Sequence, residues 1–96
     1  MIEKFADIEN SFLDIERRMS DPEIIADQST FQELVKKHAE LKDMVNAYRK
    51  YQDIEQQLTD ATDLLSDPEM KEMAEEEIAQ LNLEKEQLNN MLQLFL

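Results

Sequence analysis

The sequence contains no glycine, no cysteine and no tryptophan, and its 96 residues include only two prolines and one histidine. Without glycine, turns that need a positive φ are restricted to Asn and Asp positions, which favours long helices joined by short polar connections. Without cysteine there is no disulfide framework, no thiolate metal ligand and no thiol nucleophile, a composition that suits a reducing compartment. A glycine-rich phosphate loop is excluded as well. We therefore expect no catalytic, cofactor-binding or metal site.

Long apolar runs are also missing. No stretch approaches the ~20 apolar residues of a membrane span, and the segment Met1–Phe5, which is interrupted by charged residues, lacks the continuous apolar core of a signal peptide. The net charge is −13 and the pI is about 4.3. This charge disfavours electrostatically driven binding to nucleic acid or anionic lipid, so we expect neither a membrane partner nor direct DNA binding.

Apolar residues recur at steps of three and four in three segments, which predicts three helices in a single helical domain over residues 1–96. The first helix covers about residues 2–19 and the second about 30–65. The connection 20–29 contains Ile24 and Ile25, which we expect to form a short helical turn that covers one end of the bundle. The third helix covers about residues 68–95.

The tetrapeptide Ser-Asp-Pro-Glu occurs twice, at residues 20–23 and 66–69. Asp is a good N-cap, Pro is tolerated at the first helical position, and Glu in the first turn favours the positive end of the helix dipole. Each copy therefore predicts that one helix ends and another begins, the third at Asp67 or Pro68. For the second helix, capping-box patterns predict a start at Ser29 or Thr30.

Helix lengths constrain the architecture. Short connections make sequential helices antiparallel, and the first helix is long enough to cover only the 31–48 half of the second. We predict an all-α fold, an antiparallel three-helix bundle whose long helices two and three form a projecting coiled-coil hairpin. Lys85 interrupts the third helix's apolar stripe and can set the register. Four hairpin residues are candidates for an exposed apolar docking surface or a homodimer contact: Ile54, Leu58, Met70 and Met73.

Basic residues gather on the second helix, which is the least acidic of the three. Basic–aromatic interleaving at residues 47–51 can stack bases, but Tyr48 and Tyr51 fall on the apolar stripe and are better interpreted as core residues. His38 falls on the same stripe and is interpreted as a boundary residue without a catalytic partner. The candidate partner or RNA contacts are Lys36, Lys37, Arg49 and Lys50.

Several short motifs follow one another in a characteristic order. They are Ser20–Glu23, Asp27–Gln28, Phe31, Leu41, Ala47–Arg49, Asp67–Ala74 and the terminal Leu92–Leu96. In this order and approximate spacing, the chain resembles the N-terminal domain of the bacterial-type class I peptide chain release factors that terminate translation at UAA and UAG.

The resemblance implies that an intact protein reads stop codons with a Pro-x-Thr tripeptide and triggers peptidyl-tRNA hydrolysis with a Gly-Gly-Gln loop. Neither motif occurs here, so the resemblance implies that the catalytic and codon-reading domains are absent from this chain and that it is a fragment. It also implies a cytoplasmic protein with two partners, the factor-binding region of the large ribosomal subunit and the class II release-factor GTPase. No residue contact can be transferred.

Two other functions remain open from the sequence. A free-standing acidic coiled-coil adaptor would self-associate through the four hairpin residues. A tRNA-binding helical arm is disfavoured by the charge and would require salt-sensitive binding to RNA.

Overall fold

A computed structural model describes residues 2–96, and within that range every regular element is helical. The elements are α1 (Ile2–Met19), α2 (Pro22–Ala26), α3 (Gln28–Asp63), the short 3₁₀ helix η1 (Leu64–Ser66) and α4 (Lys71–Leu94). They fall into two compact units, one holding the described residues up to Asn46 and the other spanning Ala47–Leu96. The predicted all-α class is confirmed, as is the hairpin made by the two long helices.

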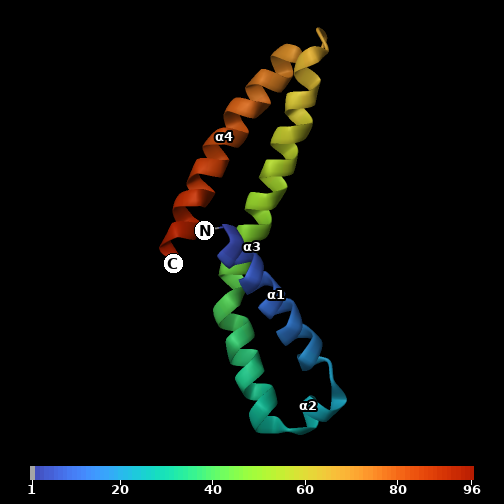
Figure 1. Cartoon of the computed structure of the whole chain (residues 1–96), viewed down its shortest axis with the longest axis vertical. Helices are drawn as coiled ribbons and strands as arrows, with labels where there is room; N and C mark the ends of the chain where they lie inside the picture. The colour runs from blue at the N-terminus through green and yellow to red at the C-terminus, as the bar shows by residue number, and fades with distance from the viewer. Residues whose placement is uncertain (1) are drawn as a thin grey trace. The chain divides into compact units, whose positions relative to one another are not determined.

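The first unit is a helical hairpin. Figure 1 shows α1 alongside the first part of α3, with α2 at the turn between them. The apolar residues of α1 lie on one face, and Phe5, Phe12 and Ile15 from that face are buried. On α3, Leu34 and Val45 are buried in the same way.

The second unit is a longer hairpin made of the rest of α3, η1 and α4 (Figure 1). Its α4 residues Ala74, Leu81 and Leu88 recur every seven positions and are all buried, as expected for a coiled-coil seam. From α3 the buried residues include Ile54 and Ala61. This unit therefore has the two-stranded seam that the sequence pattern predicted.

Both Ser-Asp-Pro-Glu segments form the same local turn. The Asp21 carboxylate accepts a hydrogen bond from the Glu23 backbone N–H at 3.0 Å, and the Asp67 carboxylate accepts one from the Glu69 N–H at 3.0 Å. No residue among 2–96 has a positive φ. The chain thus reverses direction at two Asp-Pro turns that need no glycine.

The helices after the two turns begin differently. Pro22 is the first residue of α2, as the tetrapeptide predicts. By contrast, α4 begins at Lys71 rather than at Asp67 or Pro68. The carboxylate of Asp67 already holds the turn, and the helical bonds start only where the Ala74 N–H donates to the Met70 carbonyl at 2.8 Å. The second copy therefore stabilises a turn and leaves the helix start three residues further on.

The start of α3 also differs from the prediction. The helix begins at Gln28, and neither Ser29 nor Thr30 is its cap. Asp27 takes that role, since its carboxylate accepts from the Thr30 N–H at 3.3 Å and from the Thr30 hydroxyl at 2.8 Å. The Thr30 hydroxyl bond, with the Thr30 N–H bond second, lowers the pKa of the Asp27 carboxyl below its ordinary value of 3.8.

The connection between α1 and α3 is less buried than predicted. Ile24 is half-buried, but Ile25 is 50% exposed. The expectation that both isoleucines cover the end of a bundle is therefore wrong for Ile25, because adjacent positions on a helix point about 100° apart and only one of them faces inwards.

Candidate functional site

The four hairpin residues predicted as an apolar docking surface differ widely in exposure. Ile54 is only 2% exposed, Leu58 and Met70 are half-buried, and Met73 is 60% exposed. The expectation that Ile54 is accessible is wrong, because it lies three residues after Tyr51 on the buried face of α3. These residues therefore do not form one continuous exposed patch, and Met73 is the one of the four that is mostly exposed.

Lys85 lies at the seam of the second unit and makes two contacts with α3. Its Nζ is 3.8 Å from the Glu55 carboxylate and 5.7 Å from the centroid of the Tyr51 ring. A cation over an aromatic face is attracted to the ring, and the nearby carboxylate supports the same position. The polar interruption in the α4 stripe thus has specific partners on α3, which is what a register-setting residue requires.

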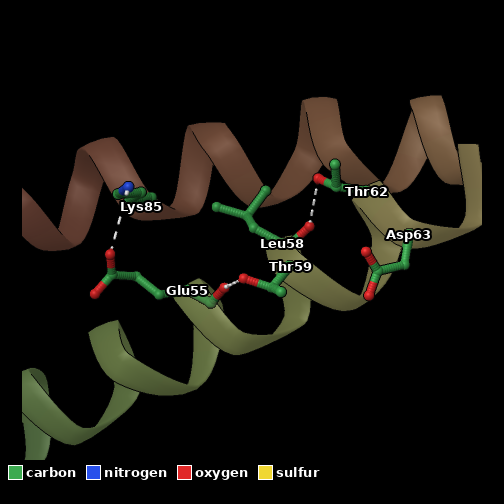
Figure 2. A pocket seen from close by; sticks show the side chains of 6 residues that line it. All are labelled: Glu55, Leu58, Thr59, Thr62, Asp63 and Lys85. Atoms are coloured by element: carbon green, nitrogen blue, oxygen red, sulfur yellow. Dashed lines mark hydrogen bonds and ion pairs between the residues drawn. The ribbon is translucent and has the colours of Figure 1, made fainter.

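A shallow pocket of about 320 Å³ lies beside this ion pair and is lined by Glu55, Leu58, Thr59, Thr62, Asp63 and Lys85 (Figure 2). Its hydroxyls are used within α3. Thr59 donates to the Glu55 carbonyl at 3.2 Å, and Thr62 donates to the Leu58 carbonyl at 2.7 Å. The pocket therefore presents no converging set of free polar groups of the kind that orients a substrate.

The candidate basic contacts fall in both units, with Lys36 and Lys37 in the first and Arg49 and Lys50 in the second. All four side chains are exposed. Lys50 also lines a second pocket of about 230 Å³ together with Glu84, Gln87, Leu88 and Met91. The exposure of these side chains suits the predicted contacts, which remain predictions.

The tyrosines between these basic residues are core residues. Tyr48 is 4% exposed and Tyr51 is 8% exposed, and the Tyr48 hydroxyl accepts a hydrogen bond from the Gln52 amide at 3.1 Å. Stacking a nucleic acid base needs an open aromatic face. The interpretation of both tyrosines as core residues is confirmed.

His38 has partners that the sequence did not reveal. Its ring stacks on Phe12 with 4.3 Å between centroids, and its Nε2 lies 3.1 Å from the Glu16 carboxylate. Phe12 and Glu16 are one helical turn apart on α1, so they share a face. That spacing was visible in the sequence, but nothing indicated that the face lies opposite His38. The cluster joins the two helices of the first unit.

The described residues hold neither a cluster of metal-binding side chains nor a helix that could span a membrane. In the described range 2–96, no three His, Cys, Asp or Glu side chains gather as a metal ion would require. The described helices are also too short or too polar to cross a membrane. The candidate features that remain are exposed side chains and the contacts between neighbouring helices.

Comparison with known proteins shows to which family the chain belongs. The family model of the PCRF domain matches residues 8–96, which is nearly the whole chain. The chain belongs to the PCRF domain family. No solved structure matches it.

Several relatives of this PCRF domain are named peptide chain release factor 1. Peptide chain release factor 1 of Pelobacter propionicus is 38% identical over 96 residues, and its counterparts in Maridesulfovibrio salexigens and Clostridium botulinum are 40% and 38% identical over 98 and 99 residues. The match includes all of this chain but only 27% or 28% of each relative, at its N-terminal part. The resemblance to release factors is therefore confirmed, and the adaptor alternative is not supported.

One exposed surface of the PCRF domain was missed at the sequence level. Leu83, Met91 and Leu94 on α4 are 57%, 48% and 88% exposed. The apolar periodicity of α4 predicts only the buried stripe of this helix. The signal that could have revealed the second surface is the absence of charged residues from positions 87–96.

Proposed function

We propose that this PCRF domain is the N-terminal interaction module of a translation termination factor, and that it is not itself an enzyme. The intact factor would recognise UAA and UAG and trigger hydrolysis of peptidyl-tRNA on the ribosome. The observation that carries the proposal is the match of the whole chain to the N-terminal part of proteins named peptide chain release factor 1. A cytoplasmic location follows from the same role.

The partners we propose are the factor-binding region of the large ribosomal subunit and the class II release-factor GTPase. The chemistry of the described surface supports a role in contact rather than catalysis. The only histidine stacks on Phe12 and bonds to Glu16, and the pocket beside Lys85 has its hydroxyls committed to α3 carbonyls. An acidic surface with a net charge of −13 suits basic protein partners.

A homodimer through the hairpin is less well supported. It was predicted from four apolar residues, and Ile54 is buried within the chain. A dimer that used this face would have to rely on Met73 and on two half-buried side chains. We therefore propose a monomeric domain in which the exposed side chain of Met73 can contact a partner.

The proposal is tested with a chimera in which this chain replaces the matched N-terminal part of Pelobacter propionicus peptide chain release factor 1. Peptide release is measured on ribosomes stalled at UAA, UAG or UGA, with the relative lacking its N-terminal part as the control. We expect release at UAA and UAG from the chimera and none from the isolated chain.

Two further readouts separate the parts of the proposal. Stimulation by the class II GTPase should be present in the chimera and absent or reduced in the control that lacks the domain. Release catalysed by the isolated chain would overturn the assignment of this domain as non-catalytic. A chimera that is folded but inactive on every codon would contradict the assignment to a termination factor.

A further inference from the structure

The α4 apolar stripe is a second face of α4, made of Leu83, Gln87, Met91 and Leu94. Steps of four, four and three place these residues in one line along the helix. They lie away from the buried seam residues Leu81, Leu88 and Leu92, which are on the other side of the same helix. Met91 and Leu94 are 48% and 88% exposed, so this line is apolar and open to solvent in the described range.

The charge pattern around the stripe differs from that of the rest of the chain. Every charged residue lies within positions 1–86, and positions 87–96 have none. Solvated helical faces in this protein carry many acids, as the run Glu75–Glu77 illustrates. Depletion of charge together with exposed Leu and Met side chains is the composition found at the centre of protein interfaces.

A pocket adjoins the stripe. The pocket of about 230 Å³ is lined by Gln87 and Met91 from the stripe, by Leu88 from the seam, and by Lys50 and Glu84. Leu88 is 7% exposed and supplies an apolar wall. The lining combines two apolar side chains with one amide and one charge of each sign, so its apolar part can receive an aliphatic side chain from an uncharged surface.

We propose that the α4 apolar stripe is the docking face for the part of a release factor that follows this domain in its relatives, and that this part presents an uncharged aliphatic surface. The inference rests on the proposed function. In those relatives the match takes up only 27% or 28% of the length, at the N-terminal part, so most of the protein lies beyond it. The stripe belongs to the last helix of the match, which places it next to that remainder in sequence.

Tethering explains why so small a surface suffices. Two segments of one chain meet at an effective concentration on the order of millimolar, so a modest patch can dock without high intrinsic affinity. A second copy of this chain would lack that advantage. Stable interfaces between separate proteins use about 20–30 residues a side, and two chains that each carry a charge of −13 repel one another.

The test uses cysteine labelling, since the chain has no cysteine of its own. Gln87→Cys places a thiol within the stripe and keeps its three apolar side chains. Alkylation is timed in the isolated 96-residue chain and in the Pelobacter propionicus chimera, with the relative's own cysteines replaced by serine. Val35→Cys, at an exposed apolar position on α3 in the first unit, is the matched control.

We expect labelling of Gln87→Cys to be about ten-fold slower in the chimera, which corresponds to docking in about nine molecules of ten. Val35→Cys should label equally fast in both proteins. Adding Leu94→Glu to the Gln87→Cys chimera should restore the fast rate, whereas adding Val35→Glu should not. Circular dichroism of each variant checks that its helices are intact.

Three results would overturn the proposal. Equal labelling rates of Gln87→Cys in the two proteins would show that nothing covers the stripe. Protection that Leu94→Glu fails to remove would place the covering surface elsewhere. Protection of the isolated chain that grows with concentration, with a dimer in sedimentation, would assign the stripe to a second copy. Peptide release is scored separately, so an unprotected but active chimera contradicts the docking face alone, and a protected but inactive one contradicts the proposed function alone.

Discussion

The two units of the protein are both helical hairpins. In each hairpin a basic side chain lies between the two helices and contacts an aromatic ring and a glutamate. In the first unit His38 stacks on Phe12 and bonds to Glu16 at 3.1 Å. In the second, Lys85 lies 3.8 Å from Glu55 and 5.7 Å from the Tyr51 ring.

Each arrangement combines an aromatic ring and a glutamate, but the first is a close stack while the second is a longer and more exposed pair. The side chain of His38 is 24% exposed and that of Lys85 is 36% exposed. Because solvent screens exposed ion pairs, the contribution of Lys85 to stability should be small and its contribution to register larger. We therefore expect the polar seam residue to contribute mainly to stability in the first unit and mainly to helix alignment in the second.

The largest effect should come from breaking the second hairpin at its centre. Ile54→Ala removes a side chain that is 2% exposed, and we expect the free energy of unfolding to fall by about 2–5 kcal/mol. Met73→Ala, at a position that is 60% exposed, is the control and should change it by less than about 0.5 kcal/mol. Urea titrations followed by circular dichroism measure both, and equal losses for the two variants would contradict the burial of Ile54.

Removing the seam histidine should have the next largest effect. His38→Ala loses the stack on Phe12 and the bond to Glu16, and we expect a loss of about 1–2 kcal/mol in unfolding free energy. A double-mutant cycle with Glu16→Gln separates the bond from the stack. If His38→Ala is no more destabilising than an exposed alanine substitution, the cluster does not join the two helices.

The corresponding change in the second unit should cost less. Lys85→Ala removes a half-exposed pair with Glu55, so we expect a loss of less than about 1 kcal/mol. Lys85→Leu should be neutral or stabilising, because an apolar residue suits a coiled-coil seam. Hydrogen exchange should nevertheless reveal a less uniform pairing of α3 with α4 in that variant. A loss from Lys85→Ala that equals or exceeds that of His38→Ala would reverse the comparison between the units.

The smallest change concerns the cap of α3. The hydrogen bonds from Thr30 lower the pKa of Asp27, so this carboxylate stabilises the fold above the unfolded value of 3.8, and the contribution is lost as the pH falls through the lower folded value. Asp27→Ala should therefore lower the Tm at neutral pH, with a smaller difference from the natural sequence in strong acid. Asp67→Ala, which removes a turn contact rather than a helix cap, is the comparison. A difference in Tm that does not shrink with acid would contradict this assignment.

Much of the fold was predictable because periodicity and turn chemistry act locally. The apolar steps of α1 and the Asp-Pro turns depend on neighbours within a few residues, and both appear in the structure as expected. The start of α4 was misplaced because one carboxylate can hold a turn or cap a helix, and Asp67 holds the turn. The cap of α3 was misplaced for the same kind of reason, since Asp27 competes with Ser29 and Thr30 for it.

The surfaces were less predictable than the helices. A helical pattern gives the face on which Ile54 or His38 lies, but not the residues of the neighbouring helix that cover it. The exposure of Ile54 was therefore predicted wrongly, and the contact between His38 and Glu16 was missed. The α4 apolar stripe was missed because Met91 and Leu94 add to the hydrophobicity of a helix whose buried seam already accounts for its pattern.

The confinement of each hairpin to its own stretch of sequence has a consequence for how the molecule forms. Helical hairpins bring together residues that are close in sequence, and such chains fold on the microsecond to millisecond scale. A ribosome adds only about 5–20 residues per second. We therefore expect the first hairpin, complete by residue 46, to be formed before the second has left the exit tunnel. The order of synthesis would then set the order of folding.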